Sequence, residues 1–115
     1  MSTVQDLTAR WHELAPGVRM SPLFGEGAML NLLEFEPGAK VPEHAHPHEQ
    51  LGMVLEGELV LRIDQVEHRL RPGHGYRIPG GTAHAAWTDE GTSCRVLDVF
   101  QPVREDYRER VAAAS

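Results

Sequence analysis

The sequence is short of cysteine, of long apolar runs and of positive charge. Its single cysteine, Cys94, cannot form a disulfide bond within the chain, which fits a reducing compartment. No apolar run approaches the ~20 residues that a helix needs to cross a bilayer, and the first residues lack the basic and then apolar segment of a secretory signal. We therefore expect a cytoplasmic protein that does not enter a membrane.

The basic side chains are few and scattered. The 115 residues hold 11 basic and 17 acidic side chains, a net charge of −6, with no basic stripe. Proteins that bind nucleic acid gather lysine and arginine on one face, so nucleic acid is not an expected partner. A chain of this length that is 41% hydrophobic can bury one core, and we predict a single domain over residues 1–115.

Long helical patterns are missing from the middle of the chain, where short apolar runs alternate with turns rich in glycine and proline. The turns recur every 8 to 12 residues or so, which is typical of an all-β sandwich or barrel. We predict a barrel core over about residues 18–101. The runs expected to form strands are 20–24, 28–35, 40–46, 50–56, 58–64, 67–70, 76–78, 83–88 and 93–100.

The two ends of the chain differ from this core. Residues 1–17 are expected to form an N-terminal arm, in which residues 3–14 are either a short helix capped by Thr3 or an extended segment. Residues 102–115 lose the strand pattern, and the mixture of charge and alanine from Arg104 to Ala114 predicts a terminal helix.

Histidines are concentrated in one stretch. His44 and His46 alternate along an expected strand, which places both side chains on one face, and His84 follows a Pro-Gly-Gly-Thr-Ala turn later in the chain. Neutral imidazole is the commonest side-chain ligand of transition metals, and Gln50 adds an amide oxygen. We predict a site for one divalent metal (nickel, manganese, iron, zinc, cobalt or copper), the alternative being a polar loop rich in histidine.

The other histidines are weaker candidates. His48 has the parity of a ligand, but Pro47 precedes it and would disturb the strand, so it is either a ligand, a neighbour of the ligands or a surface residue. Gln50 is also open to a purely structural reading. Three further histidines have no neighbour at ligand spacing and are expected at the surface or in local hydrogen bonds: His12, His68 and His74.

A second chemical signal lies near the end of the last strand. Asp98 sits inside an apolar run, where an unpaired carboxylate is costly to bury, so it needs a partner, a cavity or an ion pair with an arginine. Phe100 shares its parity, and Arg104 can reach back to hold a carboxylate bidentately. The alternatives without a functional role are that Phe100 only packs in the core and that Arg104 lies at the surface. Together these residues predict a pocket for a small anionic ligand.

These motifs resemble those of the cupins, small jelly-roll barrels (double-stranded β-helices) of two sheets. The first cupin motif is matched by Gly38, His44-Ala45-His46, Gln50 and Gly57 in the expected spacing, with Gln50 where glutamate is usual. The second is matched by Gly73, Pro79-Gly80-Gly81 and His84, with Thr88 where asparagine is usual. The resemblance implies metal ligands at His44, His46, Gln50 and His84.

A narrower resemblance covers nearly the whole chain. The segments 14–19, 44–50 and 97–107 are similar to single-domain cupins of the pectin-degradation type, some of which convert 4,5-unsaturated uronates to linear keto forms. Glutamine is the usual third ligand there, and the matching active-site residues are Asp98, Phe100 and Arg104. The resemblance implies a metal-dependent isomerase or tautomerase of sugar acids and, by analogy with small cupins, a homodimer. Two other functions remain open: a non-catalytic cupin that binds or senses a small ligand, and a metal-dependent dioxygenase.

Overall fold

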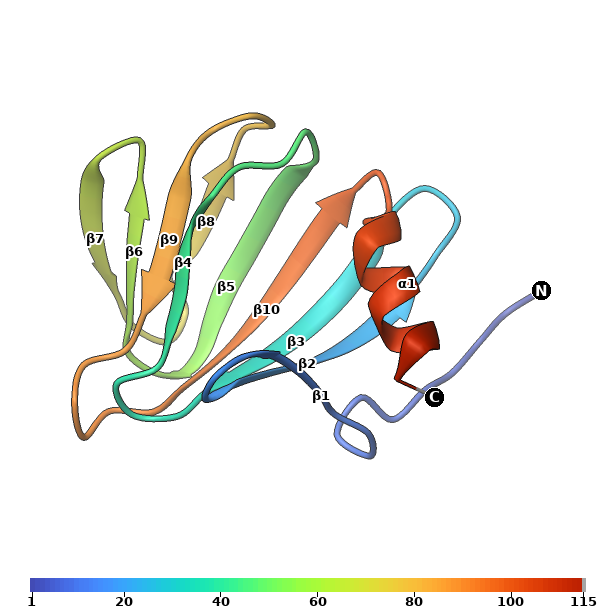
Figure 1. Ribbon diagram of the computed structural model, residues 1–115, viewed down its shortest axis with the longest axis horizontal. Helices are drawn as coiled ribbons and strands as arrows, with labels where there is room; N and C mark the ends of the chain where they lie inside the picture. Colours follow the sequence, from blue (N-terminus) through green and yellow to red (C-terminus); the bar gives the residue numbers. More distant parts are fainter. Residues whose placement is uncertain (115) are drawn as a thin grey trace.

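The computed structural model describes residues 1–114, and within them the chain forms ten β-strands and one α-helix (Figure 1). Each predicted run overlaps one strand, and one further strand, β1, precedes them. The elements are β1 His12–Ala15, β2 Val18–Phe24, β3 Met29–Phe35, β4 Lys40–His44, β5 Glu49–Gly57, β6 Leu59–Ile63, β7 Val66–Leu70, β8 Gly75–Ile78, β9 His84–Trp87, β10 Cys94–Gln101 and α1 Glu105–Ala113.

The strands form two antiparallel sheets. The larger has the order β1-β2-β3-β10-β5-β8 and the smaller the order β4-β9-β6-β7. In Figure 1 the smaller sheet lies at the left, the larger sheet runs from the centre to the right, and α1 lies at the right-hand end. The chain crosses between the sheets after β3, β4, β5, β7, β8 and β9. The prediction of an all-β barrel made of two sheets is confirmed.

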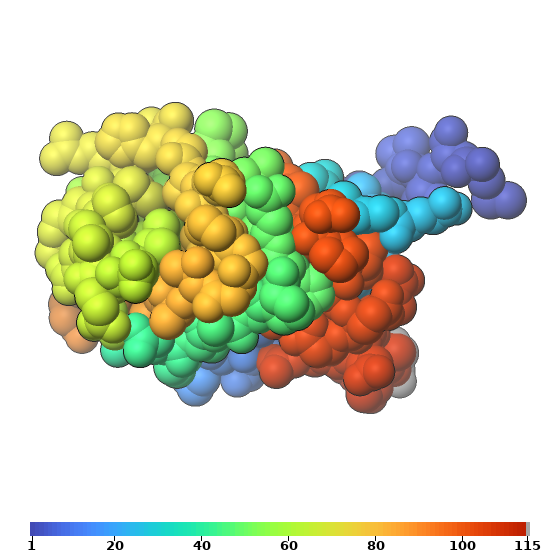
Figure 2. All heavy atoms as spheres, turned by 90° about the horizontal axis from the view of Figure 1, so that it is seen from above, coloured from blue at the N-terminus to red at the C-terminus, as the bar shows by residue number. Residues whose placement is uncertain are grey.

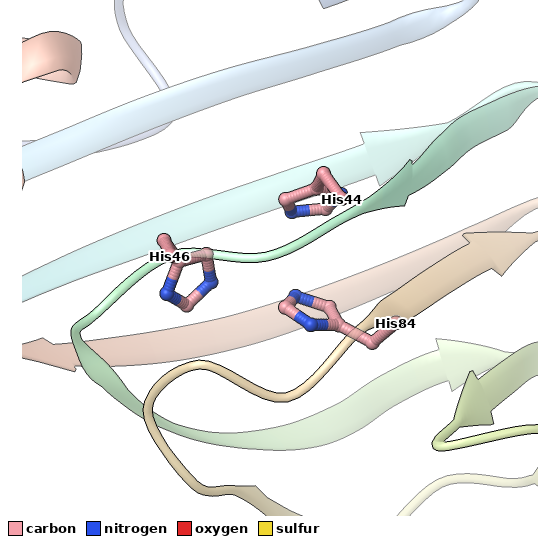
Figure 3. A group of neighbouring side chains, drawn as sticks. All are labelled: His44, His46 and His84. Carbon is pink, nitrogen blue, oxygen red and sulfur yellow. The ribbon is translucent and has the colours of Figure 1, made fainter.

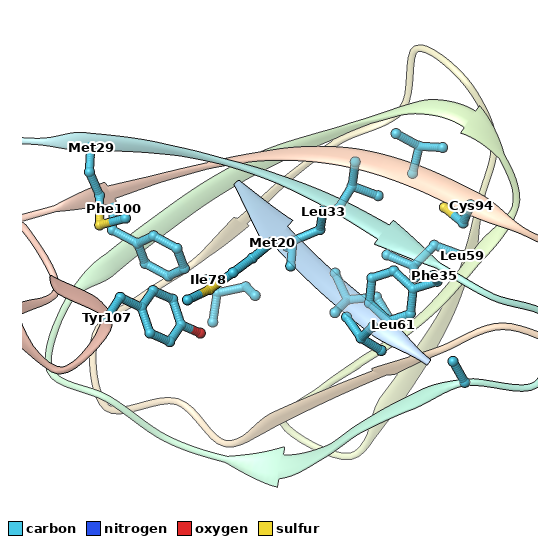
Figure 4. Close-up of a cluster of buried hydrophobic side chains, with 14 of the residues drawn as sticks. Met20, Met29, Leu33, Phe35, Leu59, Leu61, Ile78, Cys94, Phe100 and Tyr107 are labelled. Carbon is cyan, nitrogen blue, oxygen red and sulfur yellow. The ribbon is translucent and has the colours of Figure 1, made fainter. Parts of the chain in front are cut away.

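The core fills the space between the sheets because inward and outward residues alternate along the strands. In β10, Cys94, Val96, Asp98 and Phe100 are buried while the residues between them are only half-buried, the period of two that a strand requires. Figure 4 shows the apolar side chains that meet between the ribbons. The buried cluster includes Met20, Met29, Leu33, Phe35, Leu59, Leu61, Ile78, Cys94, Phe100 and Tyr107.

The structure of the two ends of the chain shows which of the predicted conformations they adopt. The predicted terminal helix is confirmed as α1, which packs Tyr107 into the core. The helical alternative for residues 3–14 is wrong, since residues 12–15 form β1 and pair with β2. An isolated short helix needs a surface to pack against, and Val4, on the apolar face expected of that helix, is 99% exposed. None of the described residues forms a helix long and apolar enough to span a membrane.

The turn between β5 and β6 depends on a glycine. Gly57 has a φ of 78°, in the left-handed region, and a Cβ atom there would overlap the carbonyl oxygen of Ser93. We expect Gly57→Ala to lower the free energy of unfolding by at least ~2 kcal/mol, because left-handed strain and the clash add together. Urea denaturation measures this.

Gly27 provides the matched control, because a Cβ atom there meets nothing within 4 Å. Gly27→Ala should leave the denaturation midpoint close to that of the wild type. Equal midpoints for both variants would contradict the part assigned to Gly57.

Candidate metal centre

Three histidine side chains meet on the inner side of the smaller sheet. His44 ends β4, His46 lies in the loop that follows, and His84 begins β9, directly opposite His44 in the register. Their rings turn toward one another (Figure 3), and one ligand atom from each lies within 4.8 Å of the other two. The ring centroids of His44 and His84 are 4.3 Å apart, and those of His46 and His84 are 4.9 Å apart. The structure therefore brings together the three histidines that the sequence singled out.

Each of these rings is oriented by a backbone carbonyl two residues away. His44 Nδ1 lies 2.8 Å from the oxygen of Pro42, and His84 Nδ1 lies 2.8 Å from that of Thr82. His46 Nδ1 is 3.1 Å from the oxygen of its neighbour at position 48. A carbonyl can only accept, so Nδ1 carries the proton and donates in all three rings. Each Nε2 is left with a free lone pair, the arrangement found in metal-binding histidines.

Burial favours the neutral form of two of the rings. It lowers the pKa of His46 to about 4, with a further contribution from the charge of Arg104, and it lowers the pKa of His84 as well. Neutral imidazole is the form that binds a metal. His84 Nε2 is also buried without a hydrogen-bond partner among the described residues. A buried polar atom of this kind is costly unless something binds it, so the donor set fits a metal ion.

Gln50 lies beside the histidines, on β5. Its side chain is buried, and its Oε1 atom is 3.1 Å from His46 Nε2. His48 is placed differently. Its ring centroid is 5.5 Å from that of His46, and it lies outside the converging group of three. His48 contributes its carbonyl oxygen, which accepts the hydrogen bond from His46.

Asp98 faces the same interior from β10 and is 3% exposed. Its carboxylate accepts hydrogen bonds from the hydroxyl of Tyr76 and from Gln50. Burial outweighs these bonds and raises the pKa of Asp98 to about 6, so the carboxyl group is able to carry a proton near neutral pH. The sequence predicted a partner for this carboxylate but did not identify Tyr76. Gly52 was the feature that pointed to such a partner, because a glycine inside a strand often marks a close approach of neighbouring groups.

Phe100 and Arg104 close the end of the site nearest α1. The Phe100 ring meets those of His46 and Tyr107 edge-on, with centroids 5.5 and 5.8 Å away. Arg104 is 7% exposed and lies over the rings of Phe100 and Tyr107. Its Nε and Nη2 atoms donate to Asp106 at 3.2 and 2.7 Å, and Nη1 donates to the Tyr107 hydroxyl at 2.9 Å. Asp106 and Tyr107 thus fix the direction of the guanidinium group.

These groups surround a small cavity of about 40 Å³. That volume has room for about one water molecule, so a larger ligand needs side chains at the mouth to move. A wider hollow of about 660 Å³ lies elsewhere, near Trp11 and Arg19, but its two central arginines are already paired with Glu34. The predicted site residues that line the small cavity are His44, Gln50, His84, Asp98, Phe100 and Arg104.

The sequence also matches a known family. A model described as a cupin domain matches residues 31–100, more than half of the chain, and this stretch contains the three histidines. The chain belongs to the cupin family. Its two sheets and the position of its histidine cluster are those that the cupin motifs imply.

Solved structures place this cupin more closely. The structure of KdgF from a Halomonas species superposes with a TM-score of 0.83 at 28% identity, over 93% of this chain and 98% of that one. An RmlC-like cupin from Shewanella frigidimarina superposes with a TM-score of 0.79 at 30% identity, over 85% of this chain and 87% of that one. The resemblance to KdgF-like cupins of the pectin-degradation type is confirmed.

Curated relatives of the cupin share only one region with it. A dimethylsulfoniopropionate lyase, DddW, from Ruegeria pomeroyi is 33% identical over 65% of this chain and 47% of its own length. An HTH-type transcriptional regulator, PuuR, from Escherichia coli is 33% identical over 59% of this chain and 37% of its own length. The cupin therefore spans less than half the length of either relative.

Proposed function

We propose that this cupin is a metal-dependent isomerase that converts 4,5-unsaturated uronates, which are small anionic sugar acids, to their linear keto forms. One observation carries the proposal: two residues of the histidine cluster, His44 and His84, border one cavity together with the buried carboxyl group of Asp98 and the guanidinium group of Arg104. The similarity to KdgF over 93% of the chain supports the same assignment.

The side chains divide the work by their chemistry. A divalent ion held by His44, His46, Gln50 and His84 would supply Lewis acidity toward a carboxylate or hydroxyl oxygen of the ligand. The donor set suits nickel, manganese, iron, zinc, cobalt or copper. Arg104, oriented by its own neighbours, holds the substrate carboxylate through its remaining N–H groups, and Phe100 packs against the sugar ring.

Asp98 moves the protons. When the ring opens, the hydroxyl on carbon 1 loses a proton and the bond from carbon 1 to the ring oxygen breaks, which leaves an aldehyde and an enolate. The enolate takes a proton at carbon 4 and becomes the ketone. One proton leaves and one returns, so a single carboxyl group in a site closed to water is a sufficient carrier. Asp98, buried within the cavity wall, is that group.

A turnover assay tests the proposal. The metal-loaded protein is mixed with unsaturated uronates made by digesting pectate and alginate, and the ultraviolet absorbance of the conjugated enol is followed. We expect this absorbance to fall much faster than it does spontaneously, without uptake of oxygen. Loss that requires oxygen would show the dioxygenase alternative instead, and no acceleration with any of the six metals would contradict the isomerase.

A ligand-binding or sensing cupin is the second candidate. The similarity to part of a transcriptional regulator favours it. Calorimetry separates the two candidates. Saturable binding of uronates without a product in the NMR spectrum indicates a binding protein, whereas binding followed by the keto product indicates the enzyme.

We further propose that the cupin works in the cytoplasm as a homodimer that pairs through its larger sheet. Leu51 and Met53 project outward from β5 and are 44% and 42% exposed. The N-terminal residues stand off from the body at the right of Figure 2, with Val4 99% exposed. Apolar surface of this kind on a sheet is stabilised when a second copy covers it.

The dimer interface can be broken by one charge. We expect Met53→Glu to give a monomer in sedimentation velocity, because it buries a carboxylate in the proposed interface. Val66→Glu is the matched control, since Val66 is 56% exposed on β7 of the other sheet, and it should remain dimeric. A wild-type protein that is monomeric at micromolar concentration would contradict the dimer.

A further inference from the structure

Tyr76 reaches Asp98 across a strand that lies between them. Asp98 on β10 is opposite Gly52 on β5, and Gly52 is opposite Tyr76 on β8. A Cβ atom on Gly52 would overlap both the Tyr76 ring and the Asp98 carboxylate. Because Gly52 has no side chain, the ring lies over it and its hydroxyl donates to Asp98 Oδ1. The missing side chain is what allows the contact.

Asp98 has a second partner on β5, two residues before Gly52 and on the same face of that strand. This partner is Gln50, which is a diagonal neighbour of Asp98 in the register of β5 and β10 and lines the same cavity. Hydrogen bonding from its side chain lowers the pKa of the Asp98 carboxyl group against the effect of burial. A carboxylate that accepts from a tyrosine hydroxyl needs donors at its other positions, so the Gln50 end facing it is the NH₂ group. The amide oxygen must then point the opposite way.

The opposite direction leads to the histidine cluster. Gln50 Oε1 lies 3.1 Å from His46 Nε2, whose lone pair is free because Nδ1 donates to a carbonyl. Two lone pairs that face one another at this distance repel unless a proton or a cation lies between them. The reversed amide would place its oxygen against the carboxylate of Asp98, where the two acceptors repel. Its NH₂ group could donate to His46 Nε2 but could not bind a metal ion held by the histidines.

We propose that Tyr76 is a positioning residue for the metal centre. By fixing the Asp98 carboxylate it holds the Gln50 amide with its oxygen toward the three histidines, and so gives the site its fourth, oxygen ligand. The inference rests on the metal site of the proposed function but not on the sugar reaction. It assigns to Tyr76 a task that acts through Asp98 and Gln50.

Metal affinity is the direct readout. We expect Tyr76→Phe to bind Ni²⁺ about 10- to 100-fold more weakly in a chelator competition, the usual effect of losing a partner of a metal ligand. Tyr107→Phe is the matched control, because it also removes a buried hydroxyl but one that bonds to Arg104. Its Ni²⁺ affinity should equal that of the wild type.

A double-mutant cycle separates positioning from general damage. In Gln50→Glu both ends of the side chain are oxygen, so there is no amide to orient, and adding Tyr76→Phe should then weaken Ni²⁺ binding far less than it does in the wild type. An equal loss in both backgrounds, or unchanged affinity in Tyr76→Phe, would overturn the inference. Wild-type protein that binds no Ni²⁺ would overturn the metal site as well.

The wild type provides a test that needs no variant. With Zn²⁺ bound, the two NH₂ protons of Gln50 should persist in the ¹⁵N NMR spectrum as separate, slowly exchanging signals, because they donate to Asp98. Coordination through nitrogen, or rapid exchange of these protons with water, would overturn the inference even if Tyr76→Phe failed to fold.

Discussion

Replacing Asp98 by asparagine should reduce uronate turnover by about 10²- to 10⁴-fold, the range expected when a general acid–base group is lost. An amide is neither an acid nor a base near neutral pH, so this side chain can no longer take the proton from the hydroxyl on carbon 1 or return one to carbon 4. The surrounding geometry should survive. The amide oxygen can still accept from Gln50, and the amide NH₂ group can donate to the oxygen of Tyr76. Metal content should therefore stay at the wild-type level.

The assay of Asp98→Asn is the ultraviolet loss of the enol, with metal content measured in parallel. Asp89→Asn is the matched control, because Asp89 is an exposed carboxylate that pairs with Arg69 at the surface. It should keep full activity. If Asp98→Asn retained most of its turnover, proton transfer would belong to another group, and if it lost the metal together with activity, Asp98 would be holding the metal.

Replacing His84 by alanine should remove the metal itself. Its Nε2 atom is buried, lacks a hydrogen-bond partner among the described residues and faces two other histidines. Loss of a ligand should weaken metal binding by more than the ~100-fold seen when only a partner of a ligand is lost. We expect His84→Ala to be isolated without metal and to have no turnover.

Thermal unfolding gives an independent check of the same variant. A metal that binds only the folded chain stabilises it by about 2.7 kcal/mol at a concentration 100 times its Kd, so the Tm of the wild type should rise when Ni²⁺ is added. The Tm of His84→Ala should not. His68→Ala, which changes an exposed histidine on β7, should respond as the wild type does. A metal-dependent Tm in His84→Ala would contradict the assigned ligand set.

The strands and the histidine cluster could be predicted because their signals are local. Alternation along the chain put His44 and His46 on one face, and the glycine turns located the strands to within a few residues. His84 could be predicted because the second cupin motif places a histidine at a fixed spacing after the Pro-Gly-Gly turn. The same local reasoning placed Asp98 inside, and the structure confirms that it is buried.

The partners of these residues could not be predicted, because they depend on which strands lie side by side. Tyr76 reaches Asp98 only because β5 lies between β8 and β10 in the sheet. The position of Asp106 against Arg104 likewise depends on how α1 begins. The helical alternative for residues 3–14 was wrong for a related reason: its apolar residues matched a helical pattern, but the fold offered no surface to cover Val4.

The most direct test of the metal centre is a crystal structure of the nickel-loaded protein with anomalous data collected at the nickel edge. We predict one strong anomalous peak per chain, in contact with Nε2 of His44, His46 and His84 and with Oε1 of Gln50. A ligand soaked into these crystals should lie between that peak, Asp98 and Arg104. A peak bound through Nδ1 atoms, a peak at His12, His68 or His74, or no peak at all would contradict the metal centre described above.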